Sequence, residues 1–547
     1  MGGFNSGYGI GGLLKEGHQS FEGIDEAVGK NIEAARQLSE ITRTSIGPNG
    51  MNKMVINHLE KMFVTSDAST ITEELEVVHP AAKLLVLAAR AQEQEVGDGT
   101  NLVVTLAGEL LKQSEPLLRD GIAPADILSG FNMAREYACG VMDAMVCEEV
   151  KDFTNRAQLI KVVRSVLMSK QWGLEDILAP LVVDACMAVC PKNAANFAVD
   201  SVRTAKIIGS NVGASEMKRG LVVRRGVEGT VKHLKDVRVA IFQNGIDLAD
   251  TDTSGTVLIR NADELTDLAN SEERRMGAMV KELHDAGVTC VVAGSTVSEL
   301  ATHFFERHGM MLVKVISKFE QRRICKVTGA AQLAKFVLPS PAEIGVCSSV
   351  SEDEIGGSKV TVFTQSAEDA ATGVATVVLR ASTENILDDL ERAIDDAVNV
   401  FRATAKDGRF VPGACACELE MSRRLKAHAR TLPGLEQYAM EAYAKALEVL
   451  PTTMAENAGW DGTEALSTLY KAHADGKESA GVDIDGACVM DAKEQGVMDN
   501  VSVKWWALKH ATDAAVTVLR VDQIIMSKQA SSKAAAERAN QPAMGGR

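Results

Sequence analysis

The sequence lacks the features that would direct it to a membrane or to nucleic acid. No basic leader precedes an apolar run, and the longest apolar runs are far shorter than a membrane span requires. Lysine and arginine do not cluster, and the formal net charge is −16, so neither nucleic acid nor an anionic membrane is expected as a main partner. These absences predict a soluble protein of the cytoplasm or a similar compartment.

Disulfide and zinc-binding patterns are also missing. The ten cysteines are spread from Cys139 to Cys488 without the dense spacing of a disulfide scaffold, so we expect free thiols. Only the pairs at 186/190 and 415/417 are close, and neither has a second pair at the spacing of a zinc ribbon. We therefore expect no structural metal at the cysteines.

Two common nucleotide-binding motifs are absent in their functional form. The Walker spacing G-x₄-G-K-[ST] occurs nowhere around the glycine turn at 47–50. Residues 7–12 match the dinucleotide fingerprint G-x-G-x-x-G letter for letter, but no strand precedes them and no helix opens from them. This segment is therefore interpreted as part of a flexible tail.

What the chain does have is a globular composition with a change of pattern along its length. Of its 547 residues, 46% are hydrophobic and 24% are charged, which predicts a globular protein of two to four domains. Apolar residues recur at helical spacing up to about residue 205 and again after residue 380. Between 205 and 379 short strand-like runs alternate with helices. This order predicts a multidomain α and α/β fold, with the α/β module inserted into a mostly helical domain built from both chain ends.

The expected elements follow this outline. A hairpin is predicted at 53–56 and 61–65, and the segment 245–275, first rich in turns and then helical, is expected to project from the module. Strands of the inserted module are predicted at 220–223, 237–242, 288–293, 310–316, 359–363 and 375–379. Helices of the second half are predicted at 384–405, 414–430, 435–450, 463–473 and 503–526. The ends, 1–20 and 527–547, are expected to be flexible or disordered.

The most informative stretch is QEQEVGDGTN, from Gln92 to Asn101. Its glycines separate two apolar helical patterns, so the second helix begins with exposed backbone N–H groups. Thr100 is predicted to cap this helix, and the helix N-terminus favours an anion. Asp98 lies in the same turn and can hold a hard cation such as Mg²⁺. The stretch therefore predicts a site for a metal-bound polyphosphate, and the alternative is ordinary turn chemistry.

Seven motifs, taken in order, resemble the nucleotide-site motifs of group II chaperonins. They are TSIGPNGMNKMV at 44–55, TSDASTI at 65–71, HPAAK at 79–83, EVGDGT at 95–100, VPG at 411–413, ENAGWDG at 456–462 and LRVDQII at 519–525. The resemblance covers nearly the whole chain apart from its tails. Several motifs in the same order are more specific than any one of them.

The resemblance implies an ATP-driven ring subunit that encloses and folds proteins. A mostly helical equatorial domain would comprise 1–150 and 409–526, and a hinge-like intermediate domain would comprise 151–205 and 380–408. An apical α/β domain would occupy 206–379, with a helical lid protrusion near 245–275, and 527–547 would be a disordered tail. The implied cofactors are ATP and Mg²⁺. The implied partners are paralogous chaperonin subunits in a hetero-oligomeric double ring and unfolded client proteins.

The resemblance also implies roles for individual residues. Asp98 would be the Mg²⁺ ligand, Lys170 would sense the γ-phosphate, and Asp396 would position the attacking water. Other residues would bind the nucleotide: Gly47, Pro48, Gly97, Gly99, Thr100, Asn101, Gly413, Asn457, Ala458 and Asp499. Without the resemblance, the run of carboxylates around Asp396 would be interpreted as a solvated helix face.

The chain departs from the family pattern at the site itself. Asn52 stands where the family usually has aspartate and Asn101 where it has threonine. Ala414 and Cys415 replace glycines, which predicts a narrower pocket. One alternative is therefore a ring subunit that binds ATP but contributes mainly structure and client contacts. A stand-alone phosphotransferase is a second alternative, against which the absence of a Walker loop and of a kinase-like residue series counts.

Overall fold

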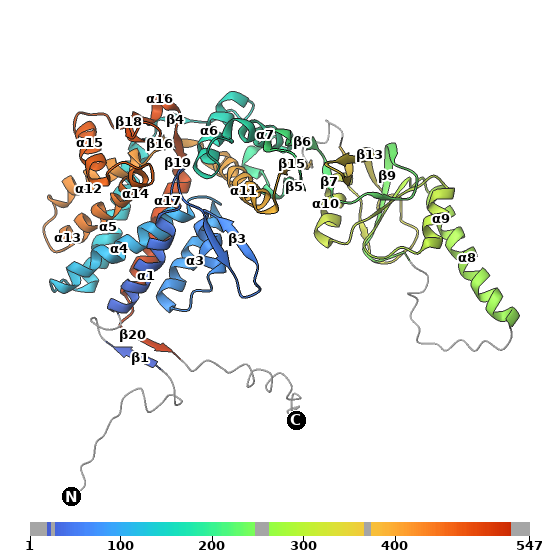
Figure 1. Ribbon diagram of the computed structural model, residues 1–547, viewed down its shortest axis with the longest axis horizontal. Coiled ribbons are helices and arrows are strands. Elements are labelled where there is room, and N and C mark those ends of the chain that lie inside the picture. Colours follow the sequence, from blue (N-terminus) through green and yellow to red (C-terminus); the bar gives the residue numbers. More distant parts are fainter. Residues whose placement is uncertain (1–18, 23–27, 247–261, 366–372, 527–547) are drawn as a thin grey trace, which may run out of the picture.

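The computed structural model describes residues 19–22, 28–246, 262–365 and 373–526. Most of both predicted tails, the glycine fingerprint at 7–12 and the first part of the predicted protrusion lie outside these ranges. Figure 1 shows a helical body at one end, coloured blue and red, and a green-to-yellow α/β module at the other. The predicted fold class is confirmed, because both chain ends build the helical body and the α/β module is inserted between them.

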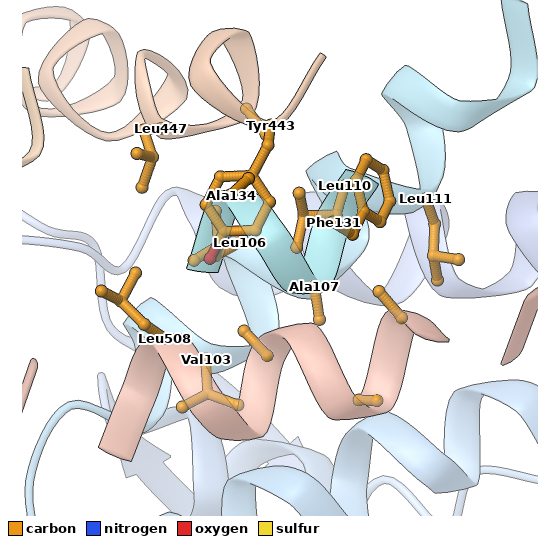
Figure 2. Packing of buried hydrophobic residues seen from close by; sticks show 14 of the residues in the cluster. Val103, Leu106, Ala107, Leu110, Leu111, Phe131, Ala134, Tyr443, Leu447 and Leu508 are labelled. Carbon is orange, nitrogen blue, oxygen red and sulfur yellow. The ribbon is translucent and has the colours of Figure 1, made fainter. Parts of the chain in front are cut away.

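The helical body is organised around one central helix, α4 (Thr100–Arg119). Every residue from Val103 to Leu111 is buried, as expected for a helix that neighbours surround on all sides. Those neighbours are α1 (Gly29–Arg43), α3 (Pro80–Glu95), α5 (Pro124–Ala144), α13 (Glu436–Leu447) and α17 (Val501–Leu519). Figure 2 shows side chains of α4 gathered with Phe131, Tyr443 and Leu508 in one core.

A close helix crossing fixes the position of α4. A Cβ atom added at Gly108 would lie 2.2 Å from the Cβ of Ser39 on α1, so only glycine allows the two helices to approach this closely. The close packing of α4 therefore fixes the position of its N-terminus.

The middle of the molecule combines helices with a small sheet. Helices α6 (Arg156–Lys170), α7 (Glu175–Val189) and α11 (Glu384–Lys406) share a core with strands of a three-stranded sheet. That sheet has the order β5 (Val202–Ile208), β15 (Ala375–Ala381) and β6 (Glu216–Arg219). The strand predicted at 375–379 is thus present, but it pairs in this small sheet and not in the large sheet of the α/β module. The chain leaves this small sheet after β6 and returns to it through β15.

The α/β module is built on a mixed sheet with parallel strands at its centre. The strand order is β7 (Leu221–Val223), β14 (Ser358–Thr364), β13 (Gly345–Ile355), β9 (His233–Phe242), β10 (Cys290–Ala293), β11 (Met311–Lys314) and β8 (Val227–Glu228), and β12 (Gln332–Leu333) pairs with β9. Helices α9 (Glu299–Arg307) and α10 (Lys318–Thr328) accompany it. Figure 1 shows α8 (Ala262–Asp285) extending away from this sheet.

Two of the predicted helices differ from the structure, one at its end and one by an internal break. The helix predicted at 503–526 ends at Leu519, and β20 (Gln523–Met526) pairs with β1 (Gln19–Glu22). A short apolar run cannot distinguish a strand from the last turn of a helix. The helix predicted at 435–450 is two helices, α13 and α14 (Val449–Asn457). Pro451 explains the break, because it lacks an N–H and fits only in the first turn of a new helix.

The remaining elements are short. The predicted hairpin is confirmed as β2 (Lys53–Ile56) and β3 (Met62–Thr65), and α2 (Ala68–Glu74) follows it. Strand β16 (Arg409–Pro412) pairs with β19 (Met498–Asn500) and with β4 (Glu148–Glu149), and β17 (Ala480–Asp483) pairs with β18 (Cys488–Asp491). The remaining helices are α12 (Ala416–Ala429), α15 (Gly462–Ala474) and α16 (Ala492–Gln495). No helix within the described ranges is long and apolar enough to cross a membrane.

A buried ionic network joins α12 to α15 and, through His473, to β17. Glu420 is fully buried and accepts hydrogen bonds from Arg423, Arg424 and the Nδ1 of His473, while Nε2 of His473 lies 2.9 Å from the carbonyl oxygen of Ala480. Burial alone would raise the pKa of Glu420, but the His473 and arginine donors outweigh it and lower the pKa to about 2. The ionised carboxylate therefore stabilises the folded chain.

The network predicts a pH-dependent loss of stability. The contribution of Glu420 is present above its unfolded-state pKa and is lost as the pH falls from about 5 toward 2. Glu420→Gln should therefore reduce the free energy of unfolding by about 3 kcal/mol at pH 7, and the difference from wild type should shrink toward zero at low pH. Urea unfolding across this range measures it. The matched variant Glu441→Gln, at an exposed position of α13, should show no such difference; a difference in Glu420→Gln that is independent of pH would contradict the assignment.

Candidate functional site

The turn before α4 has a backbone that only glycine adopts readily. Gly97 and Gly99 have φ angles of +82° and +83°. A Cβ atom at Gly97 would lie 2.3 Å from the Cγ of Asn399 on α11, so this position has no room for a side chain. Gly99 occupies the N-cap position of α4. The turn therefore lies directly against α11, and the first N–H groups of the buried helix α4 follow immediately after it.

Two amides hold this turn in place. The Nε2 of Gln92 donates to the backbone oxygen of Asp98 at 2.8 Å and to that of Val503 at 3.2 Å. The side chain of Asn101 accepts from the N–H of Ala68 at 2.7 Å and donates to the carbonyl oxygens of Ser45 and Ser66. Asn101 therefore connects the start of α4 to the turn at Ser45 and to the segment that leads into α2. Both the oxygen and the nitrogen of its side-chain amide are engaged in these contacts.

Thr100 does not cap α4, which corrects the sequence prediction. The left-handed Gly99 takes the N-cap position and has no side chain that could cap the helix. The hydroxyl of Thr100 instead donates to Oδ1 of Asp67 at 2.7 Å. Asp67 caps α2 by accepting from the N–H of Thr70. The helix dipole and the first N–H groups of α4 thus remain available to an anion.

A cluster of charges lies beside this helix end. The ammonium of Lys170 is 3.1 Å from Oδ2 of Asp396 and 3.5 Å from Oδ1 of Asp67. Burial lowers the pKa of Lys170, but Asp396, Asp67 and Asp98 outweigh it and the pKa is raised, so the ammonium stays charged. Burial raises the pKa of Asp396 well above its usual range, and Lys170 only partly opposes this. Three carboxyl groups share one ammonium in this buried space, and burial together with the neighbouring carboxylates disfavours a negative charge on Asp396, as its raised pKa indicates.

A cavity of about 220 Å³ opens next to the cluster. It is lined by residues from the two glycine turns and the cluster: Gly47, Pro48, Asp98, Gly99, Thr100, Asn101 and Lys170. Glu418, Asp499 and Lys504 also line it. Apolar side chains such as Leu450 and Met454 complete the wall. Residues separated by more than 450 positions in the sequence thus enclose one space.

Five predicted site residues do not line this cavity. Gly413 stands behind it, where an added Cβ would lie 3.2 Å from Oδ2 of Asp499. Asn457 donates to the carbonyl oxygen of Ile46, which does line the cavity. Ala458 is the C-cap residue of α14, and the structure shows no side-chain contact that connects it to the site. Gly97 and Asp396 line a second cavity of about 430 Å³.

The wall formed by Ala414 and Cys415 is strained. Both residues have positive φ angles, +52° and +62°, which side-chain-bearing residues rarely adopt. Ala414 is accommodated by a glycine opposite, because a Cβ at Gly481 would lie 2.8 Å from the Cβ of Ala414. Cys415 packs against Val449 and Leu450. Two side chains thus line the cavity in a backbone conformation suited to glycine, and the narrower pocket stays a prediction.

The residues fit a triphosphate with a divalent cation. Oδ1 of Asp98 accepts from the N–H of Gly99 at 2.7 Å, and Oδ2 has no partner in the described part of the chain. In those same residues, no three histidine, cysteine, aspartate or glutamate side chains lie close enough to hold a metal ion alone. Mg²⁺ is commonly bound by one or two carboxylates together with phosphate oxygens and water, which is the arrangement that a single free carboxylate oxygen can support.

Sequence reasoning did not select four residues of the site. Asp67 carries a recognisable signal, since an aspartate before a helix that begins Ala-Ser-Thr is a typical N-cap. Gln92, Glu418 and Lys504 carry no local signal, because each lies inside an ordinary helical pattern. The packing of distant helices brings Glu418 and Lys504 to the cavity, whereas Gln92 holds the glycine turn without lining the cavity.

Comparison with known proteins agrees with this architecture. The sequence profile of the TCP-1/cpn60 chaperonin family matches residues 38–529. The chain is 48% identical over 522 residues to T-complex protein 1 subunit theta of Dictyostelium discoideum, covering 95% of this chain and 97% of that protein. It is 47% identical to the protein of that name from Arabidopsis thaliana, covering 96% and 95% of the two chains, and 45% identical to that from Homo sapiens, covering 95% and 94%. With its motifs, its inserted α/β module and these similarities, the chain belongs to the TCP-1/cpn60 chaperonin family.

Proposed function

We propose that the chain is a theta-type subunit of the eukaryotic cytosolic chaperonin. In this role it binds and hydrolyses ATP within a hetero-oligomeric double ring of paralogous subunits that folds unfolded client proteins in the cytoplasm. The names of the similar proteins support the subunit type. The observation that carries the ATPase proposal is the joining of Asp98, Lys170 and Asp396, which come from three distant segments, at one helix N-terminus.

In the proposed mechanism, residues of this chain position the reactants. The N–H groups at the start of α4 and the turn at Gly47 bind phosphate oxygens, and Lys170 contacts the terminal phosphate. Asp98 would hold Mg²⁺, and the bound ion would supply positive charge to balance that of the phosphates. Asp396 accepts a hydrogen bond and then a proton from the attacking water, a role that its raised pKa favours.

The cluster also connects two parts of the molecule. Asp67 and Asp98 belong to the helical body, whereas Lys170 ends α6 and Asp396 lies on α11 in the middle part. A ligand that changes the charge balance among these groups changes how strongly the two parts attract each other. This contact supports a mechanism in which nucleotide state sets the angle of the middle part and, through β6 and β15, the position of the α/β module.

A second candidate is a ring subunit that binds ATP and hydrolyses it weakly or not at all. The strained wall at Ala414 and Cys415 favours this candidate, because it narrows the cavity where the backbone would approach a nucleotide. Asn52, which lacks the charge of the aspartate usual in the family, points the same way. The two candidates share the cavity and differ only in turnover.

Purification of the tagged full chain from eukaryotic cytosol tests the proposed assembly. We expect the chain to elute in a particle far larger than a single chain, together with other chaperonin subunits, and to retain Mg-ATP. A chain that elutes alone and phosphorylates a small substrate would support the stand-alone phosphotransferase instead.

A further inference from the structure

The charge cluster contributes to the walls of both cavities. Asp67 and Asp396 line the second cavity, whose volume is about 430 Å³, and Lys170, which contacts both carboxylates, lines the first. Most of the other side chains that line the second cavity are polar: Thr70, Glu93, Asp200, Arg203, Arg392 and Asp395. Nη1 of Arg392 is buried without a hydrogen-bond partner among the described residues. A space of this size and polarity holds water.

Asn399 lines the second cavity one helical turn after Asp396. Both residues belong to α11, and residues three positions apart lie on the same face of a helix. The amide of Asn399 lies against the turn that leads into α4, because a Cβ atom at Gly97 would be 2.4 Å from the amide nitrogen. In the described part of the chain this amide has no hydrogen-bond partner. Asn399 therefore offers an unused donor and acceptor beside Asp396 and the glycine turn.

The packing of α11 alone does not call for an asparagine at this place. Asparagine forms helices less readily than alanine or leucine, because its side chain competes for backbone hydrogen bonds. Asn399 is partly buried, and an apolar side chain would pack against Gly97 without a polar group to satisfy. The amide is accounted for if it binds water in the cavity.

We propose that Asn399 is a second positioning residue for the attacking water, which it holds together with Asp396. The inference rests on the proposed function, because it assumes that ATP is hydrolysed at this cluster. The amide oxygen of Asn399 accepts a hydrogen bond from one hydrogen of the water, and Asp396 accepts one from the other. A water held through both hydrogens directs a lone pair away from its two acceptors, toward a phosphate beside Lys170.

The hydrolysis step needs no further group of the protein. The water oxygen forms a bond to the terminal phosphorus, and the bond from this phosphorus to the bridging oxygen breaks, with its electron pair leaving on ADP. Asp396 takes one proton of the water, and the other proton stays on the phosphate that is formed. Asn399 orients the water without taking a proton, as a glutamine amide does in GTPases. Loss of Asn399 is therefore expected to slow the chemical step and to spare ATP binding.

Asn399→Leu in the assembled ring tests the proposal, because leucine keeps the volume and removes the amide. Turnover of cross-linked azido-ATP on this subunit should fall about tenfold, with no change in the concentration that half-saturates the chain. Azido-ADP with aluminium fluoride, which mimics the transition state with its in-line water, should bind about tenfold more weakly. Azido-ADP with beryllium fluoride, which mimics bound ATP without that water, should bind as to wild type. Asn385→Leu, at an exposed asparagine in the first turn of α11, is the matched control and should change none of these values.

The two fluoride complexes distinguish a positioning role from a structural one. Equal weakening of both complexes in Asn399→Leu would show that the residue only supports the glycine turn, and it would overturn the proposal, as would unchanged turnover. If the leucine variant does not assemble, Asn399→Ala carries the same test, and wild-type affinity for the aluminium fluoride complex there would overturn the proposal equally. A wild-type chain that retains no azido-ATP, or forms no ADP from it, would instead refute the proposed hydrolysis.

Discussion

Replacement of Asp396 by asparagine should lower ATP hydrolysis on this subunit by about a hundredfold or more and leave ATP binding nearly unchanged. The asparagine keeps the shape of the side chain but cannot accept the proton of the attacking water, and loss of a general base typically costs two to four orders of magnitude, about 100- to 10,000-fold. Lys170 keeps its second carboxylate, Asp67, so the cluster should persist. Because burial raises the pKa of Asp396, hydrolysis by the wild-type chain should also fall as the pH drops through that pKa.

The measurement must distinguish this chain from its neighbours in a ring. Cross-linking of an azido nucleotide, followed by mass spectrometry of the separated chain, gives the ratio of bound ADP to bound ATP over time on this subunit alone. Glu384→Gln is the matched control, since Glu384 is an exposed carboxylate at the start of α11 and has no ion pair in the described structure. Equal turnover in the Asp396 variant and wild type would remove the catalytic role of Asp396.

Asp98→Asn should make ATP binding insensitive to Mg²⁺. Asp98 supplies the only carboxylate in the turn that leads into α4, and its Oδ2 is the free oxygen there among the described residues. Without that ligand, bound phosphates would face the remaining carboxylates of the cluster with no cation between them. We expect the affinity for Mg-ATP to fall by about a hundredfold, because an anionic ligand next to buried carboxylates is strongly repelled.

Calorimetric titration with ATP, in Mg²⁺ and in a chelator, measures this effect. Wild type should bind far more tightly with Mg²⁺, whereas the Asp98 variant should bind with the same weak affinity in both conditions. Glu95→Gln is the matched control, because Glu95 is an exposed carboxylate three residues earlier whose loss should change nothing. A variant of Asp98 that retained full Mg²⁺ dependence would place the cation on other residues.

Much of the fold could be predicted because its main elements carry strong local patterns. The apolar run that became α4, the hairpin β2–β3 and the parallel strands β9, β10 and β11 all have the expected periodicity. Strand β13 was missed, because GVCSSVSEDEI contains few apolar residues and owes its place to neighbours on both sides. The sequence predicts helix where strand β20 lies, because the partner of this strand, β1, is about 500 residues away in sequence.

The candidate site was predictable only in part for a similar reason. Asp98 could be found because its glycine turn separates two apolar runs, and that signal is local. Lys170 and Asp396 needed the resemblance to a family, since only the tertiary structure brings α6 and α11 to the turn. The capping role expected of Thr100 was wrong, because its hydroxyl had a better acceptor in Asp67, 33 residues away.

A structure of the assembled ring with Mg²⁺ and a non-hydrolysable ATP analogue tests the central claim most directly. We predict that the phosphates lie against the N–H groups at the start of α4, with Mg²⁺ on Asp98 and the nucleoside beside Asp499. Nucleotide density elsewhere on this subunit, or none in the cavity at saturating analogue, would contradict the account.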